Sequence, residues 1–253
     1  MIPTEYATIV DLIYAHPFMT IRDNLSLVLD RINAASSAAH RQPESVQLLA
    51  VSKTQPASAV QAAMNAGQQH FGENYLQDAL NKIPHFPEAI WHFIGAIQSN
   101  KTRDIAKHFD YVHSVSNLKV IQRLNAQRDE TLGPLNIFLQ INVASEVSKS
   151  GADRAEIEDL AAATLESPRL RLLGLMAIPP AGLTPEELGA YYKQLTELQS
   201  GLAQSFGQGF PECSFGMSQD LEVAIAAGST WVRVGTAIFG PRTGALKDHL
   251  AQL

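Results

Sequence analysis

The sequence is poor in the residues that mark several common classes of protein. Its single cysteine, Cys213, cannot form an internal disulfide, and no Cys or Cys/His cluster has the spacing of a zinc site. Basic residues form no long run and the formal net charge is −6, so a general nucleic-acid-binding surface is not expected. These absences fit a reducing compartment, and we expect the chain to be cytoplasmic.

Long apolar segments are also missing. No run approaches the ~18 residues that a membrane-spanning helix needs. Residues 1–19 are fairly apolar, but they contain Glu5 and Asp11 and lack the basic start of a signal peptide. Residues 1–19 are therefore not interpreted as a signal peptide.

The remaining composition is that of a globular protein with a substantial core, since 45% of the 253 residues are hydrophobic and 17% are charged. Apolar residues at helical spacing predict an amphipathic helix over residues 20–40, with Thr20 as its N-cap. From Val46 onward, short β-branched runs alternate with helical segments. The predicted strands are 46–52, 69–72, 90–95, 111–115, 136–143, 170–178, 212–216 and 230–235.

This alternation predicts the fold class. Eight strand–helix units of about 26 residues each favour a closed (β/α)8 barrel, the TIM barrel, over an open doubly wound sheet. An open Rossmann-like sheet is the alternative, but no G-x-G-x-x-G motif follows the first predicted strand. The helices predicted between the strands are 57–66, 76–83, 100–109, 118–128, 154–165, 185–204 and 220–227, with a weaker one near the C-terminus.

The turns after the seventh and eighth predicted strands carry the first sign of a site. In a (β/α)8 barrel these two loops recurrently bind phosphate. Segments 216–218 (GMS) and 235–237 (GTA) each place a glycine and a small hydroxyl residue where a strand turns into a helix. Ser218 and Thr236 are equally suited to cap those helices, so both interpretations stay open.

Lys53 is the second candidate. It directly follows the apolar run 48–51 and is expected to project from the mouth of the first strand. A partly desolvated amine at that place can act as a nucleophile and form a Schiff base. On position alone a surface charge is the commoner interpretation, and Lys53 gains weight only in combination with a phosphate site.

Arg233 is the third candidate. It alternates with Val232 and Val234, so it is expected to point into the barrel if the valines pack against the helices. A buried guanidinium needs a partner, either a carboxylate such as Glu73 or Asp220 or an atom of a ligand.

Together these features describe a pocket for a phosphorylated aldehyde with a heteroaromatic ring. Pyridoxal 5′-phosphate (PLP) is the commonest such molecule. An arginine facing the pyridine nitrogen keeps that nitrogen unprotonated, because a fixed cation opposes a second positive charge beside it. The ring is then a weaker electron sink, so the pocket suits holding the cofactor or racemase-type chemistry.

Seven segments of the sequence match one known family in order and spacing. They are 49–53 (LAVSK), 71–75 (FGENY), 91–101 (WHFIGAIQSNK), 141–151 (INVASEVSKSG), 174–179 (GLMAIP), 216–220 (GMSQD) and 232–240 (VRVGTAIFG). With these segments the chain resembles the YggS/PROSC family of pyridoxal phosphate homeostasis proteins. The resemblance implies a fold-type III PLP barrel, similar to the N-terminal domain of alanine racemase but without its C-terminal β-domain. Residues 20–253 would form this barrel, and residues 1–19, which precede the usual start of the family, would be an N-terminal extension, either structured or due to an upstream start.

The resemblance also implies roles for individual residues. Lys53 would carry the Schiff base, Asn74 would line the ring pocket and Arg233 would face the pyridine nitrogen. Lys149 matches a second lysine proposed to take part in PLP transfer. The full set of residues implied to bind PLP is Lys53, Asn74, His92, Met176, Met217, Ser218, Arg233, Gly235 and Thr236.

We therefore expect a PLP-binding protein for intracellular PLP homeostasis, which stores the cofactor and delivers it to PLP-dependent apoenzymes as a monomer, without robust catalytic turnover. The first alternative is a PLP-dependent amino-acid racemase. Racemases use a tyrosine supplied across a dimer by a second domain, for which a barrel leaves no room in 253 residues. The second alternative is a Schiff-base aldolase, whose lysine lies on the sixth strand; segment 170–178 has no lysine.

Several other residues are expected to be structural. Cys213 is interpreted as a small buried hydrophobe, because no activating partner can be assigned to it. His70, His113, Trp91 and Trp231 lie in or next to predicted strands and are expected to be core or barrel residues.

Overall fold

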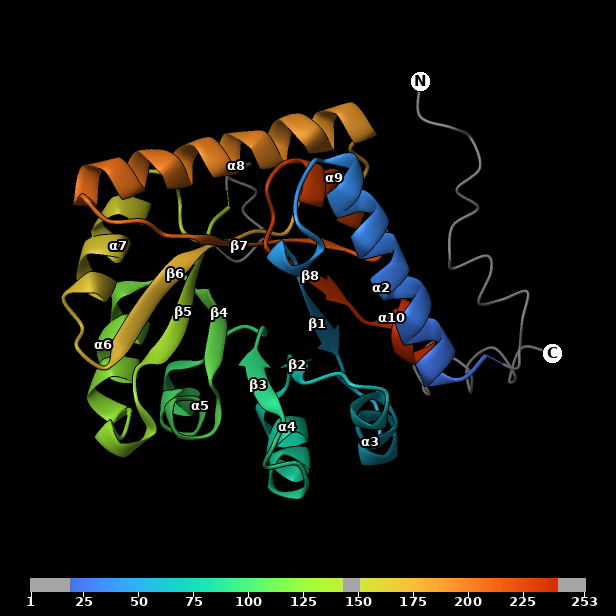
Figure 1. The fold of residues 1–253 in the computed structure, drawn as a ribbon. Helices are drawn as coiled ribbons and strands as arrows, with labels where there is room; N and C mark the ends of the chain where they lie inside the picture. Colours follow the sequence, from blue (N-terminus) through green and yellow to red (C-terminus); the bar gives the residue numbers. More distant parts are fainter. Residues whose placement is uncertain (1–18, 143–150, 241–253) are drawn as a thin grey trace.

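The computed structural model describes residues 19–142 and 151–240, and its centre is a closed ring of eight parallel strands (Figure 1). Each strand pairs with the next, and β8 pairs with β1. The predicted (β/α)8 barrel is confirmed, and the eight predicted strands differ from the observed ones by at most three residues at an end. The strands are β1 (Gln47–Val51), β2 (His70–Glu73), β3 (Ile90–Phe93), β4 (Tyr111–Val115), β5 (Leu135–Gln140), β6 (Leu170–Met176), β7 (Glu212–Met217) and β8 (Trp231–Val234).

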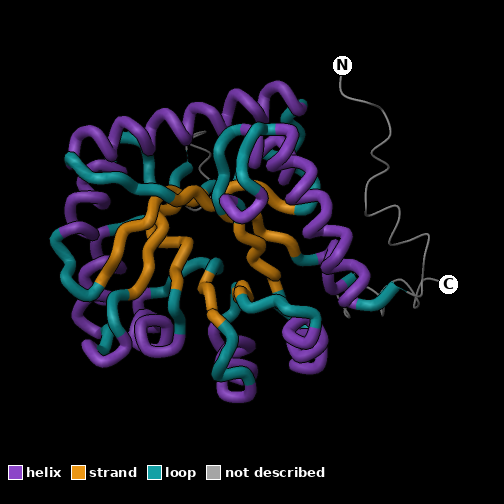
Figure 2. Tube along the Cα trace, viewed as in Figure 1, coloured by secondary structure: helices purple, strands orange, loops and turns teal. Residues whose placement is uncertain are grey.

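Helices surround this ring on the outside, and Figure 2 shows the strands as an inner layer within them. The long helix α8 runs along one side of the barrel (Figure 1). Short 3₁₀ turns occupy Pro43–Ser45, Ile83–His85, Ser99–Lys101 and Glu130–Leu132. The α-helices are α2 (Ile21–Ala38), α3 (Ala57–Asn65), α4 (Leu76–Lys82), α5 (Thr102–His108), α6 (Leu118–Gln127), α7 (Ile157–Leu165), α8 (Pro185–Phe206), α9 (Leu221–Ala226) and α10 (Thr236–Phe239).

The first described helix, α2, begins where the sequence predicts. Thr20 is its N-cap: the Asp23 backbone N–H donates to the Thr20 hydroxyl, and the Thr20 backbone N–H donates to the Asp23 carboxylate. Leu25, Val28 and Ile32 form the buried face of α2. The helix contacts α9 and α10, so it covers the barrel beside β7 and β8.

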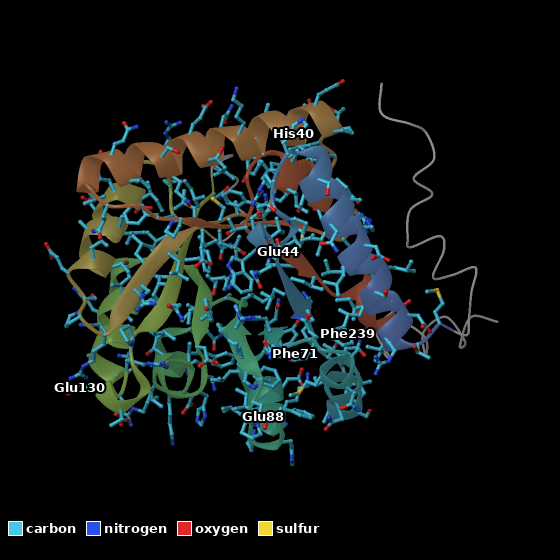
Figure 3. The ribbon with its side chains drawn as sticks, viewed as in Figure 1. His40, Glu44, Phe71, Glu88, Glu130 and Phe239 are labelled. Carbon is cyan, nitrogen blue, oxygen red and sulfur yellow. The ribbon has the colours of Figure 1, made fainter. Side chains whose placement is uncertain are left out.

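Strand alternation divides the core into two layers. Leu48 of β1 and Val232 and Val234 of β8 face outward into the layer between strands and helices. Leu49 instead packs inside the ring, where side chains fill the space between the strands (Figure 3). Because Leu49 is paired in register with Arg233, Arg233 also points inward, as its alternation with the valines predicts.

Two predictions fall outside the described residues. The proposed N-terminal extension, residues 1–19, is described only at Met19, and Lys149 is not among the described residues. Within the ranges that are described, no helix combines the length and the apolar character needed to cross a membrane.

Candidate functional site

The predicted site residues gather on one arc of the barrel mouth. Five strands that follow one another around the ring, β2, β1, β8, β7 and β6, carry most of them at or just beyond their C-terminal ends. In that order the residues are Asn74, Lys53, Gly235, Thr236, Met217, Ser218 and Met176. Residues that are far apart in the sequence therefore meet at the edge where (β/α)8 barrels build their sites.

Lys53 and Asn74 share the inner face of this edge. Val51 pairs in register with Gly72. Lys53 follows Val51 by two positions and Asn74 follows Gly72 by two positions, so the side chains of Lys53 and Asn74 point to the same face. The Oδ1 atom of Asn74 is buried and has no hydrogen-bond partner among the described residues. A buried amide oxygen left in this state is a group that a bound ligand satisfies.

The residues that alternate with these two point outward and form a charged cluster behind the site. The ammonium of Lys82 donates to Glu73 Oε1, to Asp78 Oδ2 and to the backbone oxygen of Ser52, each at 2.9 Å. The Ser52 hydroxyl donates to the same Glu73 oxygen at 2.7 Å. Sequence reasoning missed this cluster; its one local signal was the i,i+4 spacing of Asp78 and Lys82.

The cluster fixes the backbone on both sides of Lys53. Ser52 precedes it and is held by Lys82 and Glu73. Thr54 follows it with a φ of 62°, a conformation that β-branched residues rarely adopt. The Thr54 backbone N–H donates to Asp78 Oδ2 at 3.0 Å, which stabilises that conformation. The turn that carries Lys53 is thus anchored to β2 and α4.

Glu73 makes the stability of the protein depend on pH. Burial raises the pKa of Glu73 to about 6 from its ordinary 4.5, although Lys82 and Ser52 act in the opposite direction. Between those values the folded protein binds a proton that the unfolded chain has released. The contribution of Glu73 to folding is therefore lost as the pH rises through this window. Relative to Glu73→Gln, we expect the wild type to lose about 2 kcal/mol of unfolding free energy between pH 4.5 and 7.5.

Urea unfolding of both proteins at the two pH values measures this difference. Glu197→Gln is the control, because Glu197 is 65% exposed and forms only a long contact with Lys193. If the difference in unfolding free energy between the wild type and Glu73→Gln is the same at both pH values, the pKa of Glu73 is not raised in the folded protein.

A glycine is required at Gly216 and packs tightly at Gly235, in the two turns considered as phosphate sites. Gly216 has a φ of 85°, and a Cβ atom added there would lie 2.5 Å from the Cβ of Ala224. A Cβ atom at Gly235 would lie 3.2 Å from the backbone oxygen of Val51. The two glycines thus let the β7 and β8 turns pack closely against α9 and β1.

The hydroxyl groups of these turns are not used as helix caps. The N-cap residue of α9 is Asp220 and that of α10 is Gly235, and neither helix has a side-chain capping hydrogen bond. Ordinary capping therefore does not explain Ser218 and Thr236. Both stand at the mouth, where a hydroxyl group can donate to a bound anion.

Helix α2 braces both turns, a feature that sequence reasoning missed. Arg31 donates to the backbone oxygen of Ser218 at 3.1 Å while it pairs with both carboxylate oxygens of Glu222, at 2.7 and 3.0 Å. Asn24 donates to the backbone oxygen of Ile238 in α10 at 3.0 Å. One helix therefore fixes the loops after β7 and β8 relative to each other.

Asp220 completes the β7 turn. Its Oδ1 accepts the backbone N–H of Met217 at 2.6 Å, and its Oδ2 accepts the hydroxyl of Tyr192 at 2.5 Å. Burial and the charge of Asp220 raise the pKa of Tyr192, so this hydroxyl remains a donor. Met217 itself is 37% exposed at the mouth.

Arg233 points into the barrel, and of its two expected kinds of partner the carboxylate is not found. It is 5% exposed and donates to the backbone oxygen and the hydroxyl of Ser214 and to the backbone oxygen of Ala177. Neither Glu73 nor Asp220 forms a hydrogen bond or an ion pair with it, because Glu73 faces outward toward Lys82 and Asp220 accepts hydrogen bonds within its own turn and from Tyr192. The other alternative, an atom of a ligand, stays a prediction.

His92 and Met176 lie deeper than the other predicted site residues. Met176 is 1% exposed and packs inside the ring with Leu49 and Trp231. His92 is fully buried, and both of its ring nitrogens are hydrogen-bonded to other histidines. The role of His92 toward a ligand can therefore only be indirect.

The residues expected to be structural are indeed buried or engaged within the barrel. Trp91 and Trp231 are 2% and 4% exposed. His113 is fully buried and hydrogen-bonded. Burial raises the pKa of the Cys213 thiol to about 12, so this cysteine is a packed, inert side chain.

Known proteins are similar to this chain in sequence and in fold. Residues 24–243 match the family described as "Alanine racemase, N-terminal domain". The chain is 50% identical over 227 residues to the pyridoxal phosphate homeostasis protein of Escherichia coli K12, which covers 88% of this chain and 97% of that protein. The protein of the same name from Pseudomonas aeruginosa is 51% identical over 225 residues, covering 88% and 96%.

The chain belongs to the pyridoxal phosphate homeostasis protein family. The family resemblance inferred from the seven sequence segments is thereby confirmed. PipY of Synechococcus elongatus PCC7942, whose structure has been solved with PLP bound, matches this fold with a TM-score of 0.76. It is 36% identical, and the match covers 87% of this chain and 100% of that one.

Proposed function

We propose that this chain binds PLP as a Schiff base on Lys53 and serves PLP homeostasis by storing the cofactor and delivering it to PLP-dependent apoenzymes. The observation that carries the proposal is the set of polar groups that converge on the mouth and that have no hydrogen-bond partner within residues 19–142 and 151–240. They are the buried oxygen of Asn74, the hydroxyls of Ser218 and Thr236, and the guanidinium N–H groups of Arg233 that do not donate to Ser214 or Ala177. Membership of the family points to the same ligand.

The residues fit the parts of PLP in turn. The cofactor supplies an aldehyde that condenses with a lysine amine and releases water. We assign this amine to Lys53, whose turn at the end of β1 is held by the hydrogen bonds of Ser52 and Thr54. The turns at Ser218 and at Gly235–Thr236 would hold the phosphate. Arg233 would donate to the pyridine nitrogen, and Asn74 would contact the ring.

The same groups favour storage of the cofactor and not catalytic turnover of a substrate. The carboxylates described close to these turns are committed to structural hydrogen bonds; they are Glu73, Asp78, Asp220 and Glu222. A cation at Arg233 opposes protonation of the pyridine nitrogen, which weakens the ring as an electron sink. We therefore propose a cytoplasmic, monomeric carrier without robust catalytic activity, whose partners are PLP and its acceptor apoenzymes.

A transfer experiment tests this function. Protein loaded with PLP and freed of excess cofactor is mixed with a PLP-dependent apoenzyme, and the activity of that enzyme is followed. We expect activity to return, and we expect no amino-acid racemisation at ordinary enzyme rates when the loaded protein is given a panel of amino acids. Racemisation at such rates would show that the protein is a racemase and not a carrier. A colourless protein that takes up no PLP would refute both the carrier and the racemase function.

The same assay applies to Lys149, which is proposed to take part in transfer. Transfer from Lys149→Ala should be slower than from the wild type while both proteins bind the same amount of PLP. Equal transfer rates would remove Lys149 from the process.

A further inference from the structure

A chain of hydrogen bonds runs through the interior of the barrel and ends at Arg233. His70 Nδ1 lies 3.0 Å from His92 Nε2, and His92 Nδ1 lies 2.9 Å from His113 Nε2. His113 Nδ1 lies 2.8 Å from the Ser214 hydroxyl, which also accepts Nη1 of Arg233 at 2.8 Å. The three imidazoles, called here the histidine chain, come from the neighbouring strands β2, β3 and β4.

The histidine chain is rigidly packed. His92, His113 and Ser214 are fully buried. The ring of His92 stacks on Tyr111 at 4.1 Å with an angle of 7° between the planes. The ring of His113 packs on Phe138 at 4.3 Å. These contacts hold the imidazoles in the plane that their hydrogen bonds require.

Arg233 sets the direction that we assign to the hydrogen bonds of the chain. A guanidinium only donates, so the Ser214 oxygen accepts from it. We assign the Ser214 proton to its other neighbour, His113 Nδ1, because the hydroxyl then both accepts and donates within the chain. His113 must then carry its proton on Nε2 and donate to His92 Nδ1. By the same argument His92 and His70 also carry their protons on Nε2.

The histidine chain is uncharged at neutral pH. Burial, and then the charge of Arg233, lower the pKa of His113 well below its ordinary value. Burial, and then His113 and His70, do the same for His92. Arg233 forms no ion pair within residues 19–142 and 151–240, and its three hydrogen bonds go to neutral oxygens. The guanidinium is thus held in place without being neutralised.

We propose that Ser214, His113 and His92 are positioning residues that orient Arg233 toward the ring nitrogen of PLP. This inference rests on the proposed function. A carboxylate partner would cancel much of the charge of the guanidinium. The polarised chain instead supplies one strong acceptor, because each imidazole that donates onward becomes a better acceptor itself. Arg233 therefore keeps its full charge and its remaining N–H groups for the ligand.

The protonation pattern of the imidazoles tests the direction of the chain without any cofactor. Nitrogen-15 NMR of the free protein distinguishes a protonated Nδ1 from a protonated Nε2. We expect His70, His92 and His113 all to be neutral with the proton on Nε2 at pH 7. A proton on Nδ1 of His113 would overturn the inference, because His113 would then donate to the Ser214 hydroxyl instead of accepting its proton.

Ligand discrimination tests the effect of the chain on Arg233. The probes are PLP and an analogue in which a carbon replaces the ring nitrogen, and the measured quantity is the ratio of their two dissociation constants. The wild type should prefer PLP. His113→Phe, which keeps the ring packed on Phe138, should reduce this preference about tenfold, and so should Ser214→Ala. Tyr111→Phe is the matched control: it alters a ring stacked on His92, breaks no link of the chain, and should leave the ratio unchanged.

The double variant separates transmission through the chain from independent packing defects. If His113 acts through Ser214, the combined variant should lose no more discrimination than either single variant. Unchanged ratios in folded Ser214→Ala, or the same loss in Tyr111→Phe, would overturn this inference while leaving the proposed function intact. Failure of the wild type to bind PLP would instead refute the proposed function, so the two failures are distinguishable.

Discussion

Lys53→Ala is expected to abolish the visible absorbance of the PLP Schiff base and to weaken PLP binding by roughly 100-fold or more, equivalent to about 2.7 kcal/mol. The covalent link is lost, whereas the two phosphate-binding turns and Arg233 remain and hold the cofactor weakly. Absorbance of the loaded protein, together with equilibrium dialysis against PLP, measures both effects.

The matched control for this variant is Lys101→Ala. Lys101 is an exposed lysine in the 3₁₀ turn that follows β3, so it also lies beyond the C-terminal end of a barrel strand. The Lys101→Ala variant should bind PLP as the wild type does. A Schiff-base absorbance that persists in Lys53→Ala, or that disappears in Lys101→Ala, would place the reactive amine elsewhere.

Lys82→Met is expected to destabilise the fold by about 3–5 kcal/mol at pH 7.5. The side chain of Lys82 is 4% exposed and that of Glu73 is fully buried, so the variant leaves an ionised carboxylate in the interior without its cation. It also removes the donor to the backbone oxygen of Ser52, beside Lys53. Urea unfolding measures the loss of stability, and PLP titration measures the accompanying loss of affinity.

Two further variants show whether the buried charge causes this loss. Lys193→Met removes the cation of the exposed Lys193–Glu197 pair, whose nitrogen and oxygen are 3.9 Å apart, and should cost under about 1 kcal/mol. Glu73→Gln combined with Lys82→Met removes both buried charges and should recover much of the stability lost in Lys82→Met. A Lys82→Met variant as stable as the wild type would show that the cluster does not anchor the turn.

Local patterns in the sequence were enough to predict the barrel and the places of most candidate residues. The strands are short and rich in β-branched residues, and the connections have helical periodicity, so each unit is visible on its own. The alternation of Val232, Arg233 and Val234 alone was sufficient to place the arginine inside the ring. The turns at Gly216 and Gly235 were identified because they follow strands whose ends share one edge of the barrel.

The partners of these residues depend on contacts between strands that no local pattern reveals. Ser214 meets Arg233 because β7 and β8 shift register between Ser214 and Met217. The histidine chain needs the relative register of three strands, in which Gly72 pairs with His92. The position of Glu73, in contrast, could have been predicted from the sequence. It alternates with the inward-facing Asn74, so its side chain lies on the outer face, away from Arg233.

Chemical trapping identifies the lysine that holds PLP in the barrel mouth. Borohydride reduces the Schiff base to a stable amine, after which the protein is digested and the labelled peptide is identified by mass spectrometry. We expect one pyridoxyl phosphate group, attached to Lys53. A label on another lysine, or none after incubation with PLP and borohydride, would contradict this assignment.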